Sequence, residues 1–232
     1  KYAYNVRLAN KVSCSNELAA IGERVGADIE SVRLGIGADP RIGYAAIYPG
    51  CGYGGSCFPK DVRALRSAGA EVGVDTRLLD AVEAVNNRQK QLLADKAARH
   101  FGEDLSARRF ALWGLAFKPD TDDMREAPSR AVMESLWARG ASVQAFDPAA
   151  TARARHLYGE RDDLTLYSDD PYRALEDADG LIVVTEWRVL RAADPARIKS
   201  AMRGDVVIDG RNLYDPAAIR AAGLTYYGIG RQ

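Results

Sequence analysis

The first hundred residues carry apolar side chains at spacings of three and four positions, which is the period of an α-helix. The pattern predicts four helices, over residues 6–26, 28–35, 59–68 and 75–100. Gly26 suits the stop after the first of them, and Pro59 suits the start of the third. The apolar stripe of the long fourth helix needs a partner, either a second copy of the chain or another part of the same domain.

From Arg108 onward the period changes to short apolar runs separated by polar turns. Strands are expected at residues 110–114, 142–146, 164–167, 181–184, 206–209 and 224–227, and helices at 128–139 and 216–222. Strands that alternate with helices favour a parallel, doubly wound sheet. The predicted fold class is therefore α/β, with an all-helical domain over residues 1–104 followed by a parallel-sheet domain over residues 105–232.

The charge and cysteine content narrow the function. Among 232 residues, 32 are basic and 32 acidic, and this balance argues against a nucleic-acid partner. No apolar run is long enough for a transmembrane helix, and three cysteines make no disulfide framework. We therefore expect a cytoplasmic protein with reduced thiols and no membrane partner. His100, His156, Cys14 and Cys51 lack metal-ligand spacing, so no metal is expected, and Cys14 is interpreted as a helix core residue.

One glycine-rich segment carries candidate chemistry. It leads to Cys57, which lies just before the helix expected at Pro59. The partial positive charge of a helix N-terminus stabilises a thiolate, and Lys60 adds a cation nearby. Asp61 follows Cys57 by about one helical turn, so it could lie beside the sulfur and hold a water. Two alternatives fit these residues: a covalent nucleophile, or a small buried cysteine beside a capped helix.

The ten residues 52–61, GYGGSCFPKD, closely resemble the catalytic-cysteine motif of the UDP-glucose 6-dehydrogenases, in the UDP-glucose/GDP-mannose dehydrogenase family. Four further segments resemble landmarks of that family: residues 39–43, 114–126 (GLAFKPDTDDMRE), 185–187 and 209–212. Lys1 and Asn5 fit a K-x-x-A-N helix, although Tyr4 stands where the family usually has alanine. The resemblance extends over the whole chain and implies a helical dimerisation domain followed by a Rossmann-like UDP-binding domain.

The resemblance also implies a reaction, the four-electron oxidation of UDP-glucose to UDP-glucuronate with two NAD. Cys57 would attack the intermediate aldehyde to give a thiohemiacetal and then a thioester, which water hydrolyses. Lys1 would stabilise the developing oxyanion, Asn5 would orient the oxygen or a water, and Asp61 would assist water or proton transfer.

Further site residues follow from the same resemblance. Those expected to bind the substrate are Arg41, Tyr48, Tyr53, Gly54, Phe117, Lys118 and Arg211, with Arg41 reaching into a neighbouring subunit's site. Lys60 and Arg125 are expected on the NAD side. The strand ending at Gly114 is not followed by G-x-G-x-x-G, so a dinucleotide is not expected there, and Asp147 is interpreted as a turn-forming residue.

The family has an N-terminal NAD-binding domain with that fingerprint, and none occurs in these residues. We therefore expect the central and C-terminal domains only, a fragment unable to turn over alone, with UDP-glucose as ligand and a homodimer formed through the helical domain. Two alternatives stay open. One is a GDP-mannose or other UDP-sugar 6-dehydrogenase, and the other is a non-catalytic sugar-nucleotide-binding or dimerisation module. The intact Cys57, Lys60 and Asp61 argue against the second alternative.

Overall fold

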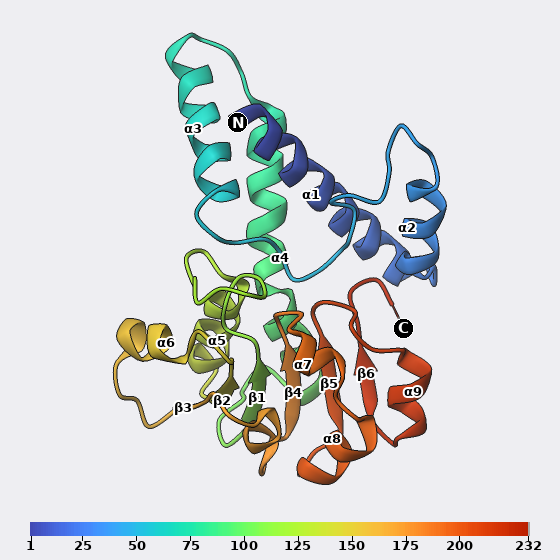
Figure 1. Ribbon diagram of the computed structural model, residues 1–232, viewed down its shortest axis with the longest axis vertical. Helices are drawn as coiled ribbons and strands as arrows, with labels where there is room; N and C mark the ends of the chain where they lie inside the picture. Colours follow the sequence, from blue (N-terminus) through green and yellow to red (C-terminus); the bar gives the residue numbers. More distant parts are fainter. Residues whose placement is uncertain (232) are drawn as a thin grey trace.

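Four helices form the N-terminal half of the chain in the computed structural model, which describes residues 1–231 (Figure 1). They are α1 (Tyr2–Val25), α2 (Ile29–Gly37), α3 (Phe58–Glu71) and α4 (Arg77–Phe101). All four predicted helices are confirmed, although α1 begins four residues earlier than predicted. Gly26 ends α1 in the left-handed conformation with φ 78°, and the Asp28 side chain caps α2 by accepting the Glu30 N–H.

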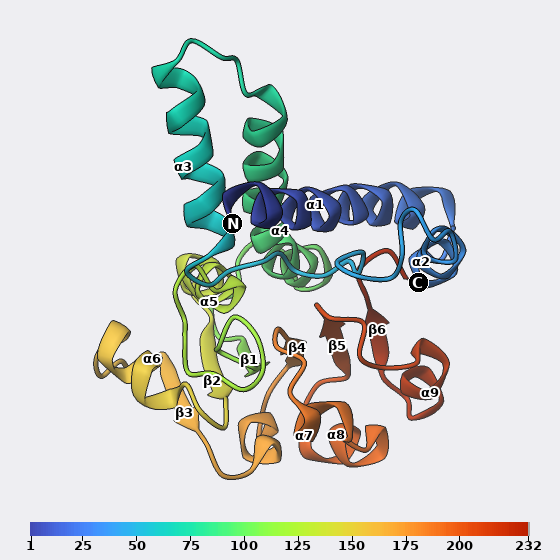
Figure 2. The same ribbon diagram turned by 45° about the horizontal axis from the view of Figure 1, so that its top comes forward.

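Small and polar side chains make up the buried face of α1, which corrects the apolar face predicted for it. The buried residues are Asn5, Ala9, Ser13, Ser15, Asn16, Ala19 and Gly22. The larger Leu18, Ile21 and Val25 are exposed, and Cys14 is exposed rather than part of the core. Helix α1 packs closely against α3 and α4, and small residues permit that approach (Figure 2). Apolar spacing alone therefore indicated the wrong face.

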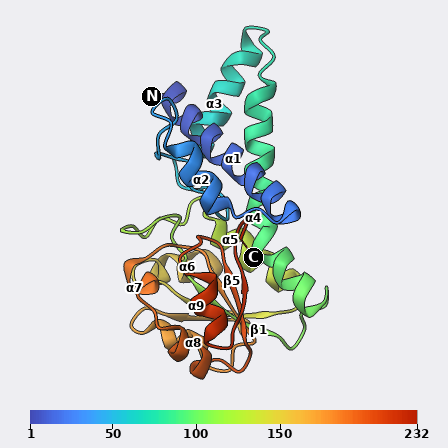
Figure 3. The same ribbon diagram turned by 90° about the vertical axis from the view of Figure 1, so that its right-hand side faces the viewer.

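Helix α4 joins the two halves of the molecule (Figure 3). Near its start, Leu79 and Val82 form a small core with Ala9 of α1 and Val62 of α3. Farther along, Leu93 is fully buried in the main core of the sheet domain. Most of the stripe on α4 is therefore covered within the chain, as one of the two alternatives had it, although Leu78 is 63% exposed.

Six strands form one parallel sheet, which confirms the predicted fold class. They are β1 (Arg109–Trp113), β2 (Ser142–Phe146), β3 (Leu164–Tyr167), β4 (Gly180–Val183), β5 (Val206–Asp209) and β6 (Thr225–Tyr227). Their order is β3-β2-β1-β4-β5-β6, and every neighbouring pair is parallel. The strand order reverses between β1 and β4, so a ligand crevice is expected at the carboxyl ends of these strands. That edge faces the helical half (Figure 1).

The sheet domain contains more short helices than the sequence predicted. Helices α5 (Pro128–Ala138) and α9 (Pro216–Ala221) were predicted, whereas α6 (Thr151–Tyr158), the 3-10 helix η1 (Pro171–Leu175), α7 (Arg188–Arg191) and α8 (Pro195–Ala201) were not. Elements of four to eight residues span too few turns to show a helical period. Within residues 1–231, none of the helices combines the length and the apolar character needed to cross a membrane.

Candidate active site

Three buried amide side chains hold the glycine-rich loop, defined here as residues 50–57. The Gly50 N–H donates to Asn16 Oδ1 at 2.8 Å, and the Gly50 carbonyl accepts from Gln89 Nε2 at 2.8 Å. Asn86 makes both bonds to Tyr53, accepting its N–H at 2.8 Å and donating to its carbonyl at 3.0 Å. Sequence reasoning missed these residues. Their signal is an amide at buried positions of α1 and α4, where an apolar residue would be expected.

The glycine-rich loop also binds the sheet domain. The Cys51 N–H donates to the Gly210 carbonyl at 2.9 Å, directly after β5. The Gly55 N–H donates to the Arg125 carbonyl at 2.7 Å. A Cβ on Gly54 would lie 2.4 Å from the Glu126 carbonyl oxygen, so only glycine allows this approach. The loop is therefore clamped between α1 and α4 on one side and the strand ends on the other (Figure 2).

Cys57 is the N-cap residue of α3 and its side chain is exposed. The Asp61 N–H donates to the Cys57 carbonyl at 2.9 Å, which establishes the predicted one-turn spacing. The Asp61 carboxylate is fully buried, and its Oδ2 accepts from Asn5 Nδ2 at 2.6 Å. Its Oδ1 has no hydrogen-bond partner among residues 1–231, although Lys60 Nζ lies 3.8 Å away. Asn5 thus orients the carboxylate and leaves one oxygen able to accept.

A cavity of about 380 Å³ opens beside Cys57 and is called the Cys57 cavity below. It is lined by Val12, Tyr48, Gly52, Tyr53, Gly54, Ser56, Cys57, Phe58, Phe117, Lys118, Glu186 and Arg211. All predicted substrate-binding residues except Arg41 therefore come together, on the loops that follow β1 and β5, on the glycine-rich loop and at Tyr48 just before it. Glu186, which follows β4, was not predicted as a site residue, and its signal was a polar residue at the carboxyl end of a buried strand.

Aromatic rings form part of the wall of the Cys57 cavity. Tyr53 and Phe58 meet edge to face with ring centroids 5.6 Å apart. Burial raises the pKa of the Tyr53 phenol to about 12, so this hydroxyl stays protonated and able to donate at neutral pH. Tyr48 is more exposed, and the Arg33 guanidinium carbon lies 4.3 Å from its ring centroid. The Tyr53 hydroxyl lies beside Ser13, which does not line the cavity, so Tyr53 and Phe58 contribute mainly ring surface to the cavity wall.

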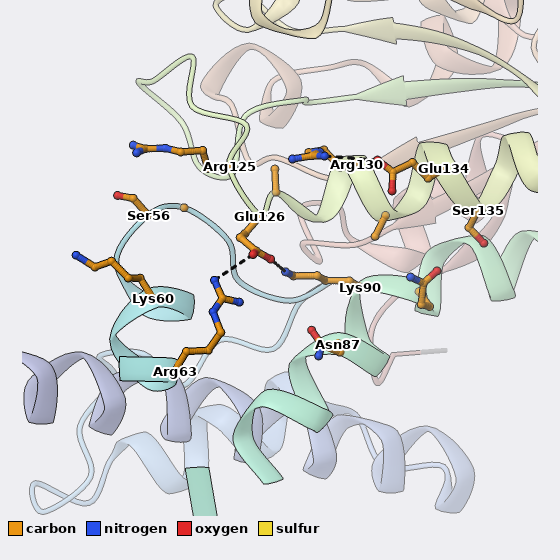
Figure 4. A pocket seen from close by; sticks show the side chains of 14 residues that line it. Ser56, Lys60, Arg63, Asn87, Lys90, Arg125, Glu126, Arg130, Glu134 and Ser135 are labelled. Carbon is orange, nitrogen blue, oxygen red and sulfur yellow. Dashed lines mark hydrogen bonds and ion pairs between the residues drawn. The ribbon is translucent and has the colours of Figure 1, made fainter. Parts of the chain in front are cut away.

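A second, larger groove of about 860 Å³ adjoins the glycine-rich loop and is called the cationic groove (Figure 4). Its lining includes the cations Lys60, Arg63, Lys90, Arg125 and Arg130 against two carboxylates, Glu126 and Glu134, among the described residues. Glu126 accepts from Lys90 Nζ at 3.1 Å and from Arg63 at 3.2 Å. Ser56 lines both openings, so the groove and the Cys57 cavity meet at the cysteine loop. The predicted Lys60 and Arg125 lie together in this groove.

Four predicted residues line neither opening: Asn5 and Asp61, which are hydrogen-bonded to each other, and Lys1 and Arg41. Lys1 is exposed at the N-cap of α1, and its carbonyl accepts the Asn5 N–H at 3.0 Å. The Arg41 side chain is 87% exposed and its Nε donates to Asp39 Oδ1 at 2.9 Å. Neither Lys1 nor Arg41 lines the Cys57 cavity or the cationic groove, and their roles stay predictions.

Asp147 directly follows β2, and its carboxylate reaches the turn after β1, where a doubly wound fold usually binds a pyrophosphate. Its Oδ2 accepts the Leu115 and Ala116 N–H groups at 2.7 and 3.0 Å, and its Oδ1 accepts those of Ala149 and Ala150 at 2.9 and 2.8 Å. The predicted structural role of Asp147 is confirmed. Because a carboxylate already satisfies the N–H groups after β1, this turn does not fit a dinucleotide, whereas the charge of the cationic groove fits phosphate groups.

Two family models match the chain. Residues 1–88 match the UDP-glucose/GDP-mannose dehydrogenase family, central domain, and residues 111–216 match the UDP-glucose/GDP-mannose dehydrogenase family, UDP binding domain. The chain belongs to this family. The order of the two domains in the UDP-glucose/GDP-mannose dehydrogenase family corresponds to the helical half and the parallel sheet described above.

Named relatives within the family support the assignment. A UDP-glucose 6-dehydrogenase from Pseudomonas aeruginosa is 50% identical, with all of this chain and 51% of the relative covered. One from Bacillus subtilis is 41% identical, with all of this chain and 52% of the relative covered. The structure of a UDP-glucose dehydrogenase from Pyrobaculum islandicum superposes with a TM-score of 0.88 at 36% identity, covering all of this chain and 50% of that one. The chain spans about half the length of the curated relatives it matches.

The position of Cys57 at a helix N-terminus predicts fast alkylation, and Cys14 provides an internal control. Both thiols are exposed, but Cys14 lies in the middle of α1, where no helix end stabilises a thiolate. We expect iodoacetamide to modify Cys57 at least about tenfold faster than Cys14 at pH 7. Peptide mapping by mass spectrometry measures both rates in one sample, and Cys57→Ser identifies the peptide. Equal rates would contradict an activated thiol.

Proposed function

We propose that this chain supplies the substrate-binding and nucleophilic parts of an NAD-dependent UDP-glucose 6-dehydrogenase, which oxidises the C6 alcohol to the carboxylate of UDP-glucuronate. The observation that carries the proposal is the Cys57 cavity, in which an exposed thiol faces the cations Lys118 and Arg211. A sugar nucleotide carries two phosphate groups that such cations attract, and a guanidinium can pair two phosphate oxygens at once. The names of the relatives support glucose as the sugar.

Cys57 would act after the alcohol has been oxidised to the aldehyde. Its thiolate attacks the aldehyde carbon and forms a carbon–sulfur bond, which gives a thiohemiacetal. Loss of a hydride from that carbon leaves a thioester. Lys60 lies in the first turn of α3, close enough in sequence to add positive charge near the sulfur and the developing oxyanion. Lys1 is proposed for the same oxyanion on the basis of the family resemblance.

Hydrolysis of the thioester needs a water that is held and deprotonated. Asp61 Oδ1 supplies an acceptor without a hydrogen-bond partner among the described residues. Asn5 fixes the other carboxylate oxygen at 2.6 Å, so the carboxylate cannot turn away. In this proposal Asp61 takes a proton from the water as the carbon–sulfur bond breaks, and the Cys57 thiolate is the leaving group.

The cofactor side of the site is proposed for the cationic groove. Two NAD molecules, bound in succession, would each accept one hydride. In this chain Lys60 and Arg125 would pair with its phosphates, and the excess of cations lining the groove supports that role. A cofactor site away from the turn after β1 is supported by the N–H groups of that turn, because Asp147 already satisfies them. A cytoplasmic location is part of the same proposal and is supported by three free cysteines.

Calorimetry with UDP-glucose, UDP and GDP-mannose tests the substrate. We expect saturable binding of UDP-glucose and UDP and none of GDP-mannose. Lys118→Ala should weaken both uridine ligands about tenfold, because it removes a charged hydrogen bond to phosphate. Lys118 is exposed and its ammonium contacts the Phe117 ring at 5.5 Å, so its removal leaves the fold intact.

Lys199→Ala on α8 serves as the matched control and should bind like the wild type. If GDP-mannose bound more tightly than UDP-glucose, the proposed substrate would be wrong and GDP-mannose would take its place. Absence of all binding would contradict the proposed function.

A homodimer through the helical half is also proposed, now on a different surface. Because most of the α4 stripe is covered, the exposed apolar residues Leu18, Ile21 and Val25 of α1 are the better candidates for the contact. In a dimer, Arg41 could reach the substrate site of the neighbouring subunit, as the family resemblance implies.

Light scattering at micromolar concentration should therefore give twice the chain mass. Leu18→Glu combined with Ile21→Glu should give a monomer, because two buried carboxylates would oppose the contact. Val72→Glu, at a residue 75% exposed at the far end of α3, is the control and should stay dimeric. A monomeric wild-type chain would contradict the proposal.

A further inference from the structure

One carboxylate lines the Cys57 cavity among the described residues, that of Glu186. It lies on the loop after β4, which ends at Val183, at the point where the strand order reverses. The other ionisable groups in the lining are the cations Lys118 and Arg211, the Cys57 thiol and the phenols of Tyr48 and Tyr53. A carboxylate is out of place in a cavity that only holds phosphates, because it repels them. Glu186 therefore calls for an explanation beyond phosphate binding.

The hydrogen bonds of Glu186 leave part of its carboxylate unused. Its Oε2 is buried and makes no hydrogen bond within residues 1–231. Arg211 Nε lies 3.2 Å away, but the hydrogen on that nitrogen is donated to the Val184 carbonyl at 2.7 Å. The ion pair holds the carboxylate in place without using its lone pairs. The side chain is 36% exposed, so its other carboxylate oxygen is the one that can accept donors from a ligand.

The donors that fit are sugar hydroxyls. A nucleoside diphosphate sugar has two parts that need different partners. Its dianionic diphosphate binds cations, whereas its uncharged hexose is rich in O–H donors that need acceptors. Cys57 must reach C6, so on the proposed function the hexose lies in this cavity. We propose that the Glu186 carboxylate accepts hydrogen bonds from hydroxyl groups of the hexose and is a specificity-determining residue of the site. This inference rests on the proposed function and adds the group that distinguishes the sugar from the nucleotide.

Calorimetry of Glu186→Gln with UDP-glucose and with UDP tests the inference. The variant keeps the shape of the side chain and removes its charge. We expect UDP-glucose to bind about tenfold more weakly, because charge-assisted hydrogen bonds to hydroxyls are lost. UDP has no hexose and should bind with unchanged or higher affinity, because a negative charge has left the cavity. Glu160→Gln, at a side chain 91% exposed, is the matched control and should change neither affinity.

UDP-glucose analogues that lack one hydroxyl group of the hexose provide a second test, which begins with the wild-type chain. Wild-type affinity should fall about tenfold for at least one of the UDP-glucose analogues lacking the 2-, 3- or 4-hydroxyl. Glu186→Gln should bind that analogue and UDP-glucose equally, since the hydroxyl has lost its acceptor.

Equal losses for UDP and UDP-glucose in Glu186→Gln would overturn the inference and assign Glu186 to holding Arg211 on the phosphates. No loss for either ligand would also overturn it. Failure of the wild-type chain to bind UDP or UDP-glucose would instead overturn the proposed function, so the two failures are distinguishable.

Discussion

The structure depends on one constraint, the simultaneous attachment of the glycine-rich loop to both halves of the molecule. Asn16, Gln89 and Asn86 hold its backbone from the helical side, while the Gly210 and Arg125 carbonyls hold it from the sheet side. Releasing one of these buried backbone groups would cost about 1–3 kcal/mol. Because Cys57 directly follows this clamped backbone, its position is fixed relative to the strand ends.

The clamp explains why the site lies where two domains meet. A doubly wound sheet offers a crevice at the carboxyl ends of its strands, and here the glycine-rich loop covers that crevice. Lys118, Glu186 and Arg211 come from the loops after β1, β4 and β5, and the nucleophile comes from the helical half. Glu126 adds a second link across the boundary by pairing with Arg63 of α3 and Lys90 of α4. Neither half holds a complete site alone.

Local sequence signals predicted the elements but not how they face one another. The six strands and the start of α3 at Cys57 follow from short apolar runs, a proline and a glycine-rich segment, which act over a few residues. Asn86 and Glu186 were missed because their roles depend on contacts with Tyr53 and Arg211, far away in the chain. Cys14 was assigned to the core because helical spacing does not say which face the neighbours cover.

The central claim is that the sugar nucleotide lies over Cys57, and protection from alkylation tests it most directly. With UDP-glucose at ten times its dissociation constant, the rate of iodoacetamide modification of Cys57 should fall about tenfold, because bound ligand covers the thiol. The rate at Cys14, exposed on α1, should not change. Saturating UDP-glucose that leaves the Cys57 rate unchanged would contradict the account, because the ligand would then bind away from the proposed nucleophile.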